Sequence, residues 1–367
     1  MSHELMMARA LILAERGVYT TAPNPRVGCV IAKNDQILAE GWHQKAGQPH
    51  AEVNALEQLD RQGLRAVQGA DCYITLEPCS HEGRTPPCAD ALIKAGIKRA
   101  FVAMVDPNPL VSGQGVKKLQ QAGIIVTTGL LEHQAEALNR GFCQRMRHNR
   151  PFVRSKIAIS LDGRTAMASG ESQWITSPQA RQDVQKLRAQ CGAIVTGIGT
   201  VLADDPQMTV RPGQWYPENQ PIRQPLRIVV DSQFKISSRA KIFSADSDTL
   251  IATVSNNKRD NIATIKLDEL SGHINLNQLM MELGNRDIND VLIEAGAVLN
   301  GAMLELGLID ELIIYMAPKI LGDSGKGAFH IPALKTMADN IDLTISDIRA
   351  VGQDWRITAK PEYRVRS

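Results

Sequence analysis

The cysteine and histidine residues of this 367-residue chain are concentrated in one part of it. Five of the six Cys and six of the eight His lie in the first 150 residues. Only Cys191, His273 and His330 follow, too few and too scattered to build a four-ligand site for a soft metal. The two parts of the chain therefore carry different chemistry, and each is long enough to bury a core of its own.

The periodic pattern of apolar residues breaks near residue 145, where several arginines stand close together and are followed by Pro151. We interpret residues 145–151 as a linker and predict two domains, residues 1–147 and residues 148–367. The arginines are also compatible with a nucleic-acid patch. Only Phe142 stands among them as an aromatic stacking partner, however, which favours a solvated linker.

The composition is that of a folded, soluble protein with small ligands. Hydrophobic residues at 43% and charged residues at 22% exclude a disordered, collagenous or coiled-coil chain. A net charge of +2 supplies no broad field for duplex nucleic acid or an anionic membrane. No uncharged apolar run approaches the roughly 18 to 20 residues of a membrane span. The apolar run 10–14 lies between charged residues, as in an amphipathic helix and unlike a signal peptide. We therefore expect a cytoplasmic protein that binds neither nucleic acid nor membranes.

Strands alternate with helices along the first part of the chain. The predicted helices are 3–16, 49–59 and 88–94, and the predicted strands are 28–32, 36–41, 70–76 and 98–105. This alternation predicts a three-layer α/β/α domain.

A possible metal site lies at the ends of these elements. His50 and Glu52 open one predicted helix, while Cys79 and Cys88 flank a loop that leads into another. One His and two thiolates hold zinc with an open fourth position, the arrangement of catalytic sites. Glu52 is placed to take a proton from a water molecule and return it to a leaving amine. A single Cys or His is more often a core residue, but this combination favours a metal site. The other cysteines of this part we interpret as core or surface thiols: Cys29, Cys72 and Cys143.

The pattern H-x-E followed by P-C and a second Cys is that of the zinc nucleobase deaminases. Eight residues separate Cys79 from Cys88, where P-C-x-x-C is usual. The longer loop resembles one family, the bifunctional riboflavin-biosynthesis deaminase/reductases, as do segments 22–28, 49–52 and 106–109. The resemblance covers essentially the whole chain. It implies a cytidine-deaminase-like domain of three α/β/α layers followed by a dihydrofolate-reductase-like α/β domain.

For the first domain, the resemblance implies zinc-dependent hydrolytic deamination of 2,5-diamino-6-(5-phosphoribosylamino)pyrimidin-4-one. The amide of Asn24 suits the polar edge of a pyrimidine, although between two prolines it is also explained as a turn residue. His81 and Arg84 suit an anionic phosphate, and His43 is expected at the pocket edge.

The second part of the chain again alternates strands with helices. The predicted strands are 152–160, 193–197, 226–231, 290–294 and 312–316, with a tight turn at Asp162-Gly163 and a helix over 177–190. No G-x-G-x-x-G is present, which argues against a Rossmann dehydrogenase. Two other strand-to-helix turns, 197–206 and 294–301, offer backbone N–H groups for an anion, although glycine at such turns more often serves packing.

The resemblance implies that this second domain uses NADPH to reduce the ribosyl group of 5-amino-6-(5-phosphoribosylamino)uracil to ribityl. The residues that match cofactor positions are Ala158, Trp174, Thr200, Asp204, Ser232, Gly296, Ala297, Val298, Leu299, Asn300, Gly301 and Ala302. Those that match substrate positions are Ser172, Arg188, Met208, Arg211 and Glu294. Arg188 and Arg211 suit a phosphate by charge, or else are ordinary solvated arginines. Trp174 is equally compatible with a core position, and the proton source is either Asp204 or water. Segment 322–327 lacks Walker spacing and is interpreted as a mobile surface loop.

Three alternatives stay open at this point. A nucleic-acid base deaminase requires a basic, aromatic-lined groove, whereas aromatic residues make up only 4% of the chain. A zinc-stabilised binding module requires a fourth protein ligand beside His50, Cys79 and Cys88. The second domain, finally, is compatible with bound nucleotide and no activity. We expect a homo-oligomer, with segment 299–316 as a dimer contact or simply a buried helix and strand.

Overall fold

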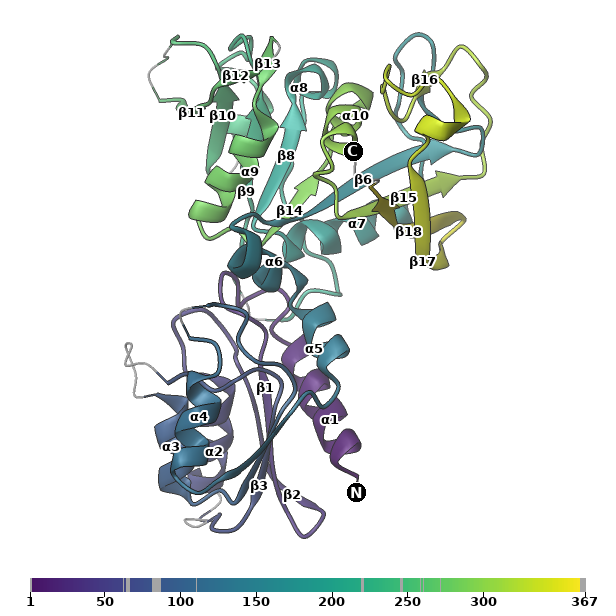
Figure 1. Ribbon diagram of the computed structural model, residues 1–367. Helices are drawn as coiled ribbons and strands as arrows, with labels where there is room; N and C mark the ends of the chain where they lie inside the picture. Colours follow the sequence, from purple (N-terminus) through teal and green to yellow (C-terminus); the bar gives the residue numbers. More distant parts are fainter. Residues whose placement is uncertain are drawn as a thin grey trace. The chain divides into compact units, whose positions relative to one another are not determined.

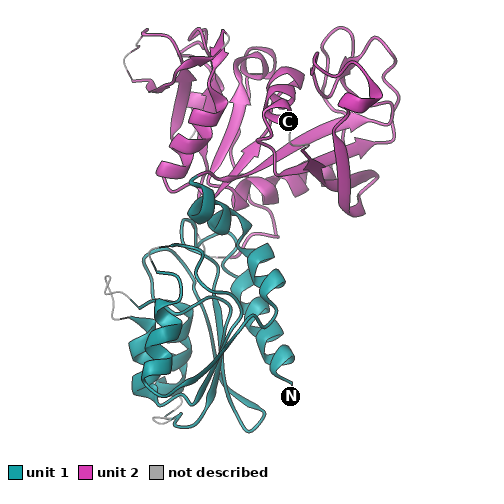
Figure 2. Ribbon diagram, viewed as in Figure 1, with its two compact units in different colours: residues 1–149 teal, residues 150–367 magenta. Residues whose placement is uncertain are grey.

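The structure, a computed structural model, forms two compact units, residues 1–149 and residues 150–367 (Figure 2). The division falls two residues after the boundary expected from the sequence. The described residues are 2–61, 63, 67–80, 87–109, 111–218, 221–244, 247–257, 259, 261–270 and 272–363.

Unit 1 is built on a five-stranded sheet in the order β2-β1-β3-β4-β5. The strands are β1 (Gly28–Lys33), β2 (Gln36–Trp42), β3 (Asp71–Ile74), β4 (Arg99–Val102) and β5 (Ile125–Thr128). Strand β1 pairs antiparallel with both β2 and β3, whereas β3, β4 and β5 are parallel. The carboxyl ends of β3 and β4 therefore meet at one edge of the sheet.

Helices cover both faces of this sheet (Figure 1). They are α1 (His3–Glu15), α2 (Ala51–Arg61), α3 (Cys88–Ala95), α4 (Gln114–Gln121), α5 (Glu132–Leu138) and α6 (Arg140–His148). Successive residues of β1 point to opposite faces: Cys29 and Ile31 pack with α2, α3 and α4, while Val30 and Ala32 pack with α1, α5 and α6. The two buried faces explain the continuous apolar run of this strand, and the expected three-layer fold is confirmed.

Unit 2 is built on a nine-stranded sheet in the order β11-β10-β9-β8-β14-β6-β15-β18-β17. The strands are β6 (Phe152–Ser160), β8 (Ala193–Gly197), β9 (Leu226–Val230), β10 (Thr249–Thr253), β11 (Ala263–Lys266), β14 (Asp290–Ile293), β15 (Glu311–Ala317), β17 (Asp342–Val351) and β18 (Asp354–Glu362). All neighbours from β11 to β15 are parallel, and the β17–β18 hairpin joins β15 antiparallel.

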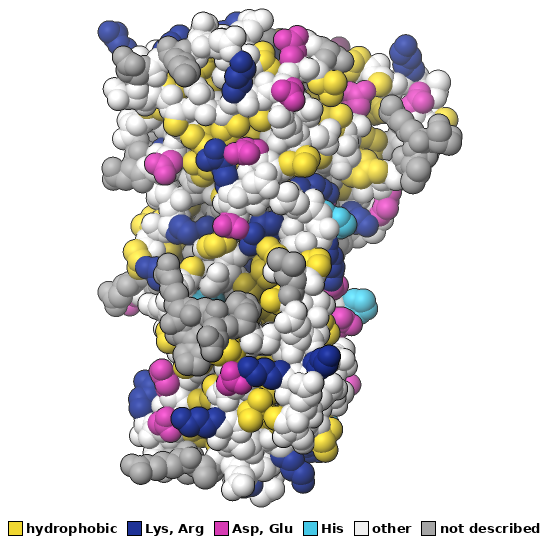
Figure 3. Space-filling view, turned by 60° about the vertical axis from the view of Figure 1, so that its left-hand side comes forward, with side chains coloured by type: hydrophobic (Ala, Val, Ile, Leu, Met, Phe, Trp, Pro, Cys, Tyr) yellow, Lys and Arg dark blue, Asp and Glu magenta, His cyan; other side chains and the backbone are white. Residues whose placement is uncertain are grey.

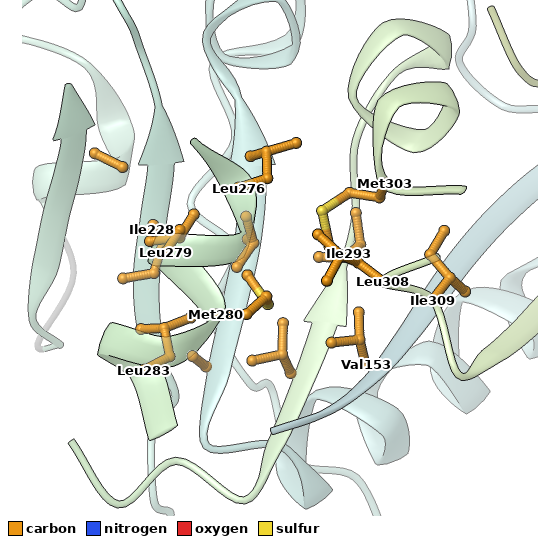
Figure 4. Close-up of a cluster of buried hydrophobic side chains, with 14 of the residues drawn as sticks. Val153, Ile228, Leu276, Leu279, Met280, Leu283, Ile293, Met303, Leu308 and Ile309 are labelled. Atoms are coloured by element: carbon orange, nitrogen blue, oxygen red, sulfur yellow. The ribbon is translucent and has the colours of Figure 1, made fainter. Parts of the chain in front are cut away.

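The helices of unit 2 are α7 (Pro178–Gln190), α8 (Ile198–Asp204), α9 (Leu276–Asn285) and α10 (Ala297–Glu305). Short elements complete the unit: β7 (Arg164–Ala166), β12 (Glu269–Leu270), β13 (His273–Ile274), β16 (Lys326–Gly327) and the 3₁₀ turns Lys241–Phe243 and Met337–Asp339. Leu279, Met280 and Leu283 of α9 pack over the sheet together with Met303 of α10 (Figure 4). Val184 and Leu187 of α7 belong to the cluster on the opposite face. Both faces are thus covered, as the buried parallel strands require.

The outer surface carries charges of both signs. On the face drawn in Figure 3, Lys and Arg side chains are interspersed with Asp and Glu. In the described part of the chain, no helix combines the length and the hydropathy that a transmembrane span requires. The segment expected as a possible dimer contact, 299–316, is largely interior, because it comprises most of α10 and the buried strand β15.

Candidate active sites

The three expected metal ligands come together in unit 1. His50 directly precedes α2, Cys79 follows β3, and Cys88 is the first residue of α3. The Nδ1 atom of His50 lies 3.7 Å from Cys79 Sγ and 3.3 Å from Cys88 Sγ. All three ligand atoms lie within 4.8 Å of one another.

This geometry fits a zinc ion. Tetrahedral zinc with Zn–S of about 2.3 Å and Zn–N of about 2.0 to 2.1 Å separates nitrogen from sulfur by about 3.6 Å. The two observed N···S distances, 3.7 and 3.3 Å, bracket this value. The set of one imidazole and two thiols is also the donor set that zinc prefers.

The pKa values of the two thiols also fit a site for a divalent cation. The Cys88 thiol and the Cys88 backbone N–H both donate to Cys79 Sγ, and His50 adds a further contact. Together they lower the pKa of Cys79 to about 4. The pKa of Cys88 is raised by its hydrogen bond to Cys79 and by burial. Two adjacent thiols thus share one negative charge, and a bound divalent cation is what allows both to ionise.

Glu52 stands in the first turn of α2, two residues after His50, and is 3% exposed. Its Oε2 atom is buried and has no hydrogen-bond partner among the described residues. Burial raises the pKa of this carboxyl to about 7. Glu52 can therefore both accept and release a proton near neutral pH, as a general acid/base requires.

Asn24 and His43 lie beside the metal ligands. The Nδ1 atom of His43 is 3.1 Å from the carbonyl oxygen of Pro49, which can only accept. Nδ1 therefore carries the proton, and Nε2, 3.1 Å from Asn24 Nδ2, accepts from that amide. The His43 ring also contacts that of His50 edge-on at 5.3 Å between centroids. His43 is 2% exposed, so it is more buried than a residue at the pocket edge. His81 and Arg84 fall outside the described residues.

In unit 2, the two expected strand-to-helix turns are neighbours. Strands β8 and β14 are adjacent and parallel, and α8 and α10 begin at their carboxyl ends. A Cβ atom added to Gly296, the N-cap of α10, would have Thr200 Oγ1 as its nearest neighbour, at 4.0 Å. One added to Gly199 would meet nothing within 4 Å. No side chain caps α10 at Gly296. Open space beside a helix N-terminus fits the phosphates of a nicotinamide dinucleotide.

Two residues of the expected cofactor segment serve the fold. Asn300 is 1% exposed, accepts from Ser155 Oγ at 2.8 Å and donates to the Ala295 carbonyl at 2.7 Å. A Cβ atom at Gly301 would come within 2.1 Å of the His330 carbonyl oxygen. Asn300 thus fixes the turn before α10 by hydrogen bonds. Gly301, which has no side chain, allows the backbone at His330 to pack closely against α10. Of the other residues of this segment, Val298 is 68% exposed, and Ala297, Leu299 and Ala302 are half-buried.

The remaining expected cofactor positions lie on several elements. Ala158 is half-buried on β6, Asp204 ends α8 and is exposed, and Ser232 follows β9. Trp174 is 61% exposed and is not a core residue. The guanidinium of Arg181 lies 4.4 Å from the centre of its ring, and Lys319 Nζ donates to its carbonyl oxygen at 2.6 Å.

Two expected substrate residues of unit 2 form a buried ion pair with each other. Arg188 of α7 donates to Glu294, just after β14, from Nε at 2.6 Å and from Nη2 at 3.0 Å. Lys156 of β6 brings its Nζ to 3.6 Å from the same carboxylate. Burial opposes ionisation of Glu294, but the two cations outweigh it and lower its pKa to about 2. The positive charge of Arg188 is therefore already paired with a carboxylate, and Arg188 is not a free cation for a phosphate.

The other expected substrate residues differ in exposure. Met208 is 5% exposed, Ser172 is half-buried and Arg211 is exposed. The backbone N–H of Arg211 donates to Gln185 Oε1 at 2.8 Å, which holds the segment next to α7.

Sequence reasoning missed Lys156 and Asn139. Lys156 lies in β6, a strand between two parallel neighbours whose residues are buried or half-buried, and a charged residue in such a strand was the available signal. Asn139 is 4% exposed; its Oδ1 accepts from the Arg26 N–H at 2.8 Å and its Nδ2 donates to the Arg26 carbonyl at 2.9 Å. These two hydrogen bonds fix the backbone of the segment that contains Asn24. Asn139 is 113 residues from Arg26 in the sequence, so no local sequence pattern could have predicted this contact.

The fold and the two sites define a zinc-dependent deaminase domain of the cytidine deaminase type joined to a nicotinamide-nucleotide reductase domain. Residues 1–104 match the family model described as "Cytidine and deoxycytidylate deaminase zinc-binding region", and residues 151–357 match the RibD C-terminal domain. The chain belongs to the RibD family.

Relatives and solved structures resemble the chain over nearly its full length. It is 51% identical to riboflavin biosynthesis protein RibD of Escherichia coli, covering 96% of this chain and 98% of that protein. The solved structure of Acinetobacter baumannii RibD is 45% identical with a TM-score of 0.90 and covers 98% of this chain and 99% of that one. A Thermotoga maritima deaminase/reductase structure is 33% identical with a TM-score of 0.87, covering 98% of each chain.

Proposed function

We propose that unit 1 deaminates 2,5-diamino-6-(5-phosphoribosylamino)pyrimidin-4-one and that unit 2 then reduces 5-amino-6-(5-phosphoribosylamino)uracil with NADPH. The Thermotoga relative carries the names of both activities, a diaminohydroxyphosphoribosylaminopyrimidine deaminase and a 5-amino-6-(5-phosphoribosylamino)uracil reductase. The observation that carries the proposal is the cluster of His50, Cys79 and Cys88 beside the buried, unpartnered Oε2 of Glu52.

In the proposed deamination, His50, Cys79 and Cys88 hold the zinc ion. Zinc in such a site lowers the pKa of a water molecule so that it can attack a ring carbon. Glu52 would accept a proton from the attacking water and return one to the leaving amine, while the other proton of the water goes to the ring nitrogen of the product. A pKa of about 7 suits Glu52 to this role. Asn24, fixed by His43, presents its amide oxygen to the pyrimidine edge. His81 and Arg84 are proposed to bind the phosphate.

In the proposed reduction, NADPH supplies the hydride. The open space at Gly199 and Gly296 receives the cofactor phosphates, with Ala297 and Val298 offering backbone N–H groups at the start of α10. The buried group of Arg188, Glu294 and Lys156 binds the ribosyl substrate as a preformed polar unit. Asp204 or water supplies the proton.

The test follows NADPH oxidation by wild-type and Glu52→Gln protein, each given the diamino-pyrimidine and, separately, its deaminated product. We expect Glu52→Gln to fail on the first compound and to act normally on the second, while it keeps its zinc. If wild type releases ammonia from the first compound but oxidises NADPH with neither, the reductase proposal is wrong. If Glu52→Gln leaves every activity unchanged, the zinc site is structural.

We also propose that the protein forms a homo-oligomer in the cytoplasm. Leu343, Ile345 and Ile348 project from one face of the edge strand β17 and are 44 to 53% exposed, which supports association with a second copy. The six cysteines are free thiols, as cytoplasmic conditions maintain. Light scattering on the full chain and on Ile345→Lys tests the association; a monomeric wild type contradicts it.

A further inference from the structure

The carboxylate of Glu77 collects an unusual number of backbone donors. Glu77 is 6% exposed and stands two residues before Cys79. Its Oε2 accepts from the N–H groups of Asp106 at 3.0 Å and Gly113 at 2.9 Å. Its Oε1 accepts from those of Gly115 at 2.7 Å and Val116 at 3.1 Å.

These four donors belong to two features of the chain. Asp106 and Gly113 both lie in the loop that connects β4 with α4, and Gly113 is its last residue. Gly115 and Val116 lie in the first turn of α4, whose own N-cap residue, Gly113, has no side chain to offer. One carboxylate therefore closes the loop and caps the helix, where a negative charge is favoured by the helix dipole.

The backbone of the Cys79 segment also lies close to the start of α4. A Cβ atom at Gly115 would come within 2.0 Å of the Pro78 carbonyl oxygen, so α4 begins against the backbone of that segment. The Glu77 N–H donates to the Met104 carbonyl at 3.0 Å, which continues the pairing of β3 with β4. The segment that contains Cys79 is thus held at Glu77 by both its backbone and its side chain.

We propose that Glu77 is a positioning residue for the zinc site, which fixes the Pro78-Cys79 segment against α4 so that Cys79 Sγ meets His50 and Cys88. The inference rests on the proposed zinc site. A carboxylate is required because all four neighbours are donors, and its two oxygens can only accept. A glutamine there would turn an NH₂ group toward two N–H groups, which would push the loop and α4 away from the segment.

The test compares zinc affinity in the full-length wild type, Glu77→Gln and Leu119→Ala by competition with a chromophoric chelator. Leu119 is fully buried in α4, so its truncation destabilises the same helix without touching the Glu77 contacts. We expect Glu77→Gln to lose about tenfold or more in zinc affinity, as seen when groups that orient metal ligands are removed. Leu119→Ala should keep wild-type affinity.

A second readout, the visible absorption of the Co²⁺-substituted protein, reports ligand geometry independently of turnover. We expect altered bands in Glu77→Gln and unaltered bands in Leu119→Ala. Glu77→Asp keeps both acceptor oxygens and should bind more zinc than Glu77→Gln; it also serves if the Gln variant does not fold. The inference is overturned if Glu77→Gln binds zinc as wild type does, or if Leu119→Ala loses as much. A wild type that binds no zinc would overturn the proposed function itself.

Discussion

The buried ion pair of unit 2 makes a quantitative prediction about stability. Glu294→Gln removes the negative charge that faces Arg188 and Lys156 and leaves both cations in a site where the carboxylate side chain is only 7% exposed. Removing one partner of a buried ion pair is strongly destabilising, because the remaining charge is uncompensated. We therefore expect unit 2 of the variant to unfold at a lower denaturant concentration than wild type.

The pKa of Glu294 sets the size and the pH dependence of this effect. Its fall from an ordinary value of 4.5 to about 2 corresponds to about 3 kcal/mol of folding free energy at pH 7. Because the pKa is lower in the folded protein, this contribution is complete above about pH 4.5. It is lost as the pH falls toward 2, where wild-type Glu294 becomes protonated and resembles glutamine.

Urea unfolding at several pH values measures the effect, with tryptophan fluorescence as the signal, since three of the four tryptophans, Trp174, Trp215 and Trp355, lie in unit 2. The difference in unfolding free energy between wild type and Glu294→Gln should be about 3 kcal/mol at pH 7 and should shrink below pH 4.5. Asp347→Asn, which breaks an exposed pair, should change stability by less than about 1 kcal/mol. A Glu294→Gln protein as stable as wild type at pH 7, or a difference that persists unchanged in acid, would refute the reasoning.

Three further predictions concern the two sites, and a fourth substitution, Gly301→Ala, serves as a structural comparison. Cys79→Ser should lose zinc and ammonia release while it still oxidises NADPH with the deaminated product; loss of both activities would contradict separate sites. Gly296→Ala should fold normally, because the added Cβ has no close neighbour in the protein. It should raise the Kd for NADPH several-fold, measured by fluorescence titration, because the Cβ occupies the space proposed for the cofactor phosphates. Gly301→Ala should instead lower the Tm, because its Cβ would overlap a backbone oxygen. Asn139→Ala should raise the KM of deamination with zinc content unchanged, because the backbone of Arg26 loses two hydrogen bonds; an unchanged KM argues against the role of Asn139 in fixing this backbone.

The strands and helices were predictable where apolar periodicity was strong. The predicted helix 177–190 is α7, and the predicted strand 193–197 is β8. The β17–β18 hairpin was not predicted, because β17 is exposed on both faces and shows no buried side to give it a pattern.

The cluster of His50, Cys79 and Cys88 was predictable from the sequence, because the chemistry of candidate metal ligands is carried by residue type and local spacing. His50 and Glu52 lie two residues apart, and Cys79 and Cys88 flank one loop, so each pair is visible without a fold. The fold then brings the two pairs together because β3, followed by Cys79, lies next to β1 in the sheet that α2 covers.

The sequence by itself determined the residue chemistry and the alternation of strands and helices, and through them the class of both units. Only the tertiary structure decided which polar side chains form hydrogen bonds and ion pairs with one another. Arg188 and Glu294 are 106 residues apart, and both had been expected to bind substrate, yet they pair with each other. Such pairing depends on which strand helix α7 packs against and on where that strand lies in the sheet. This arrangement is set by packing over the whole unit, and no local pattern contains it.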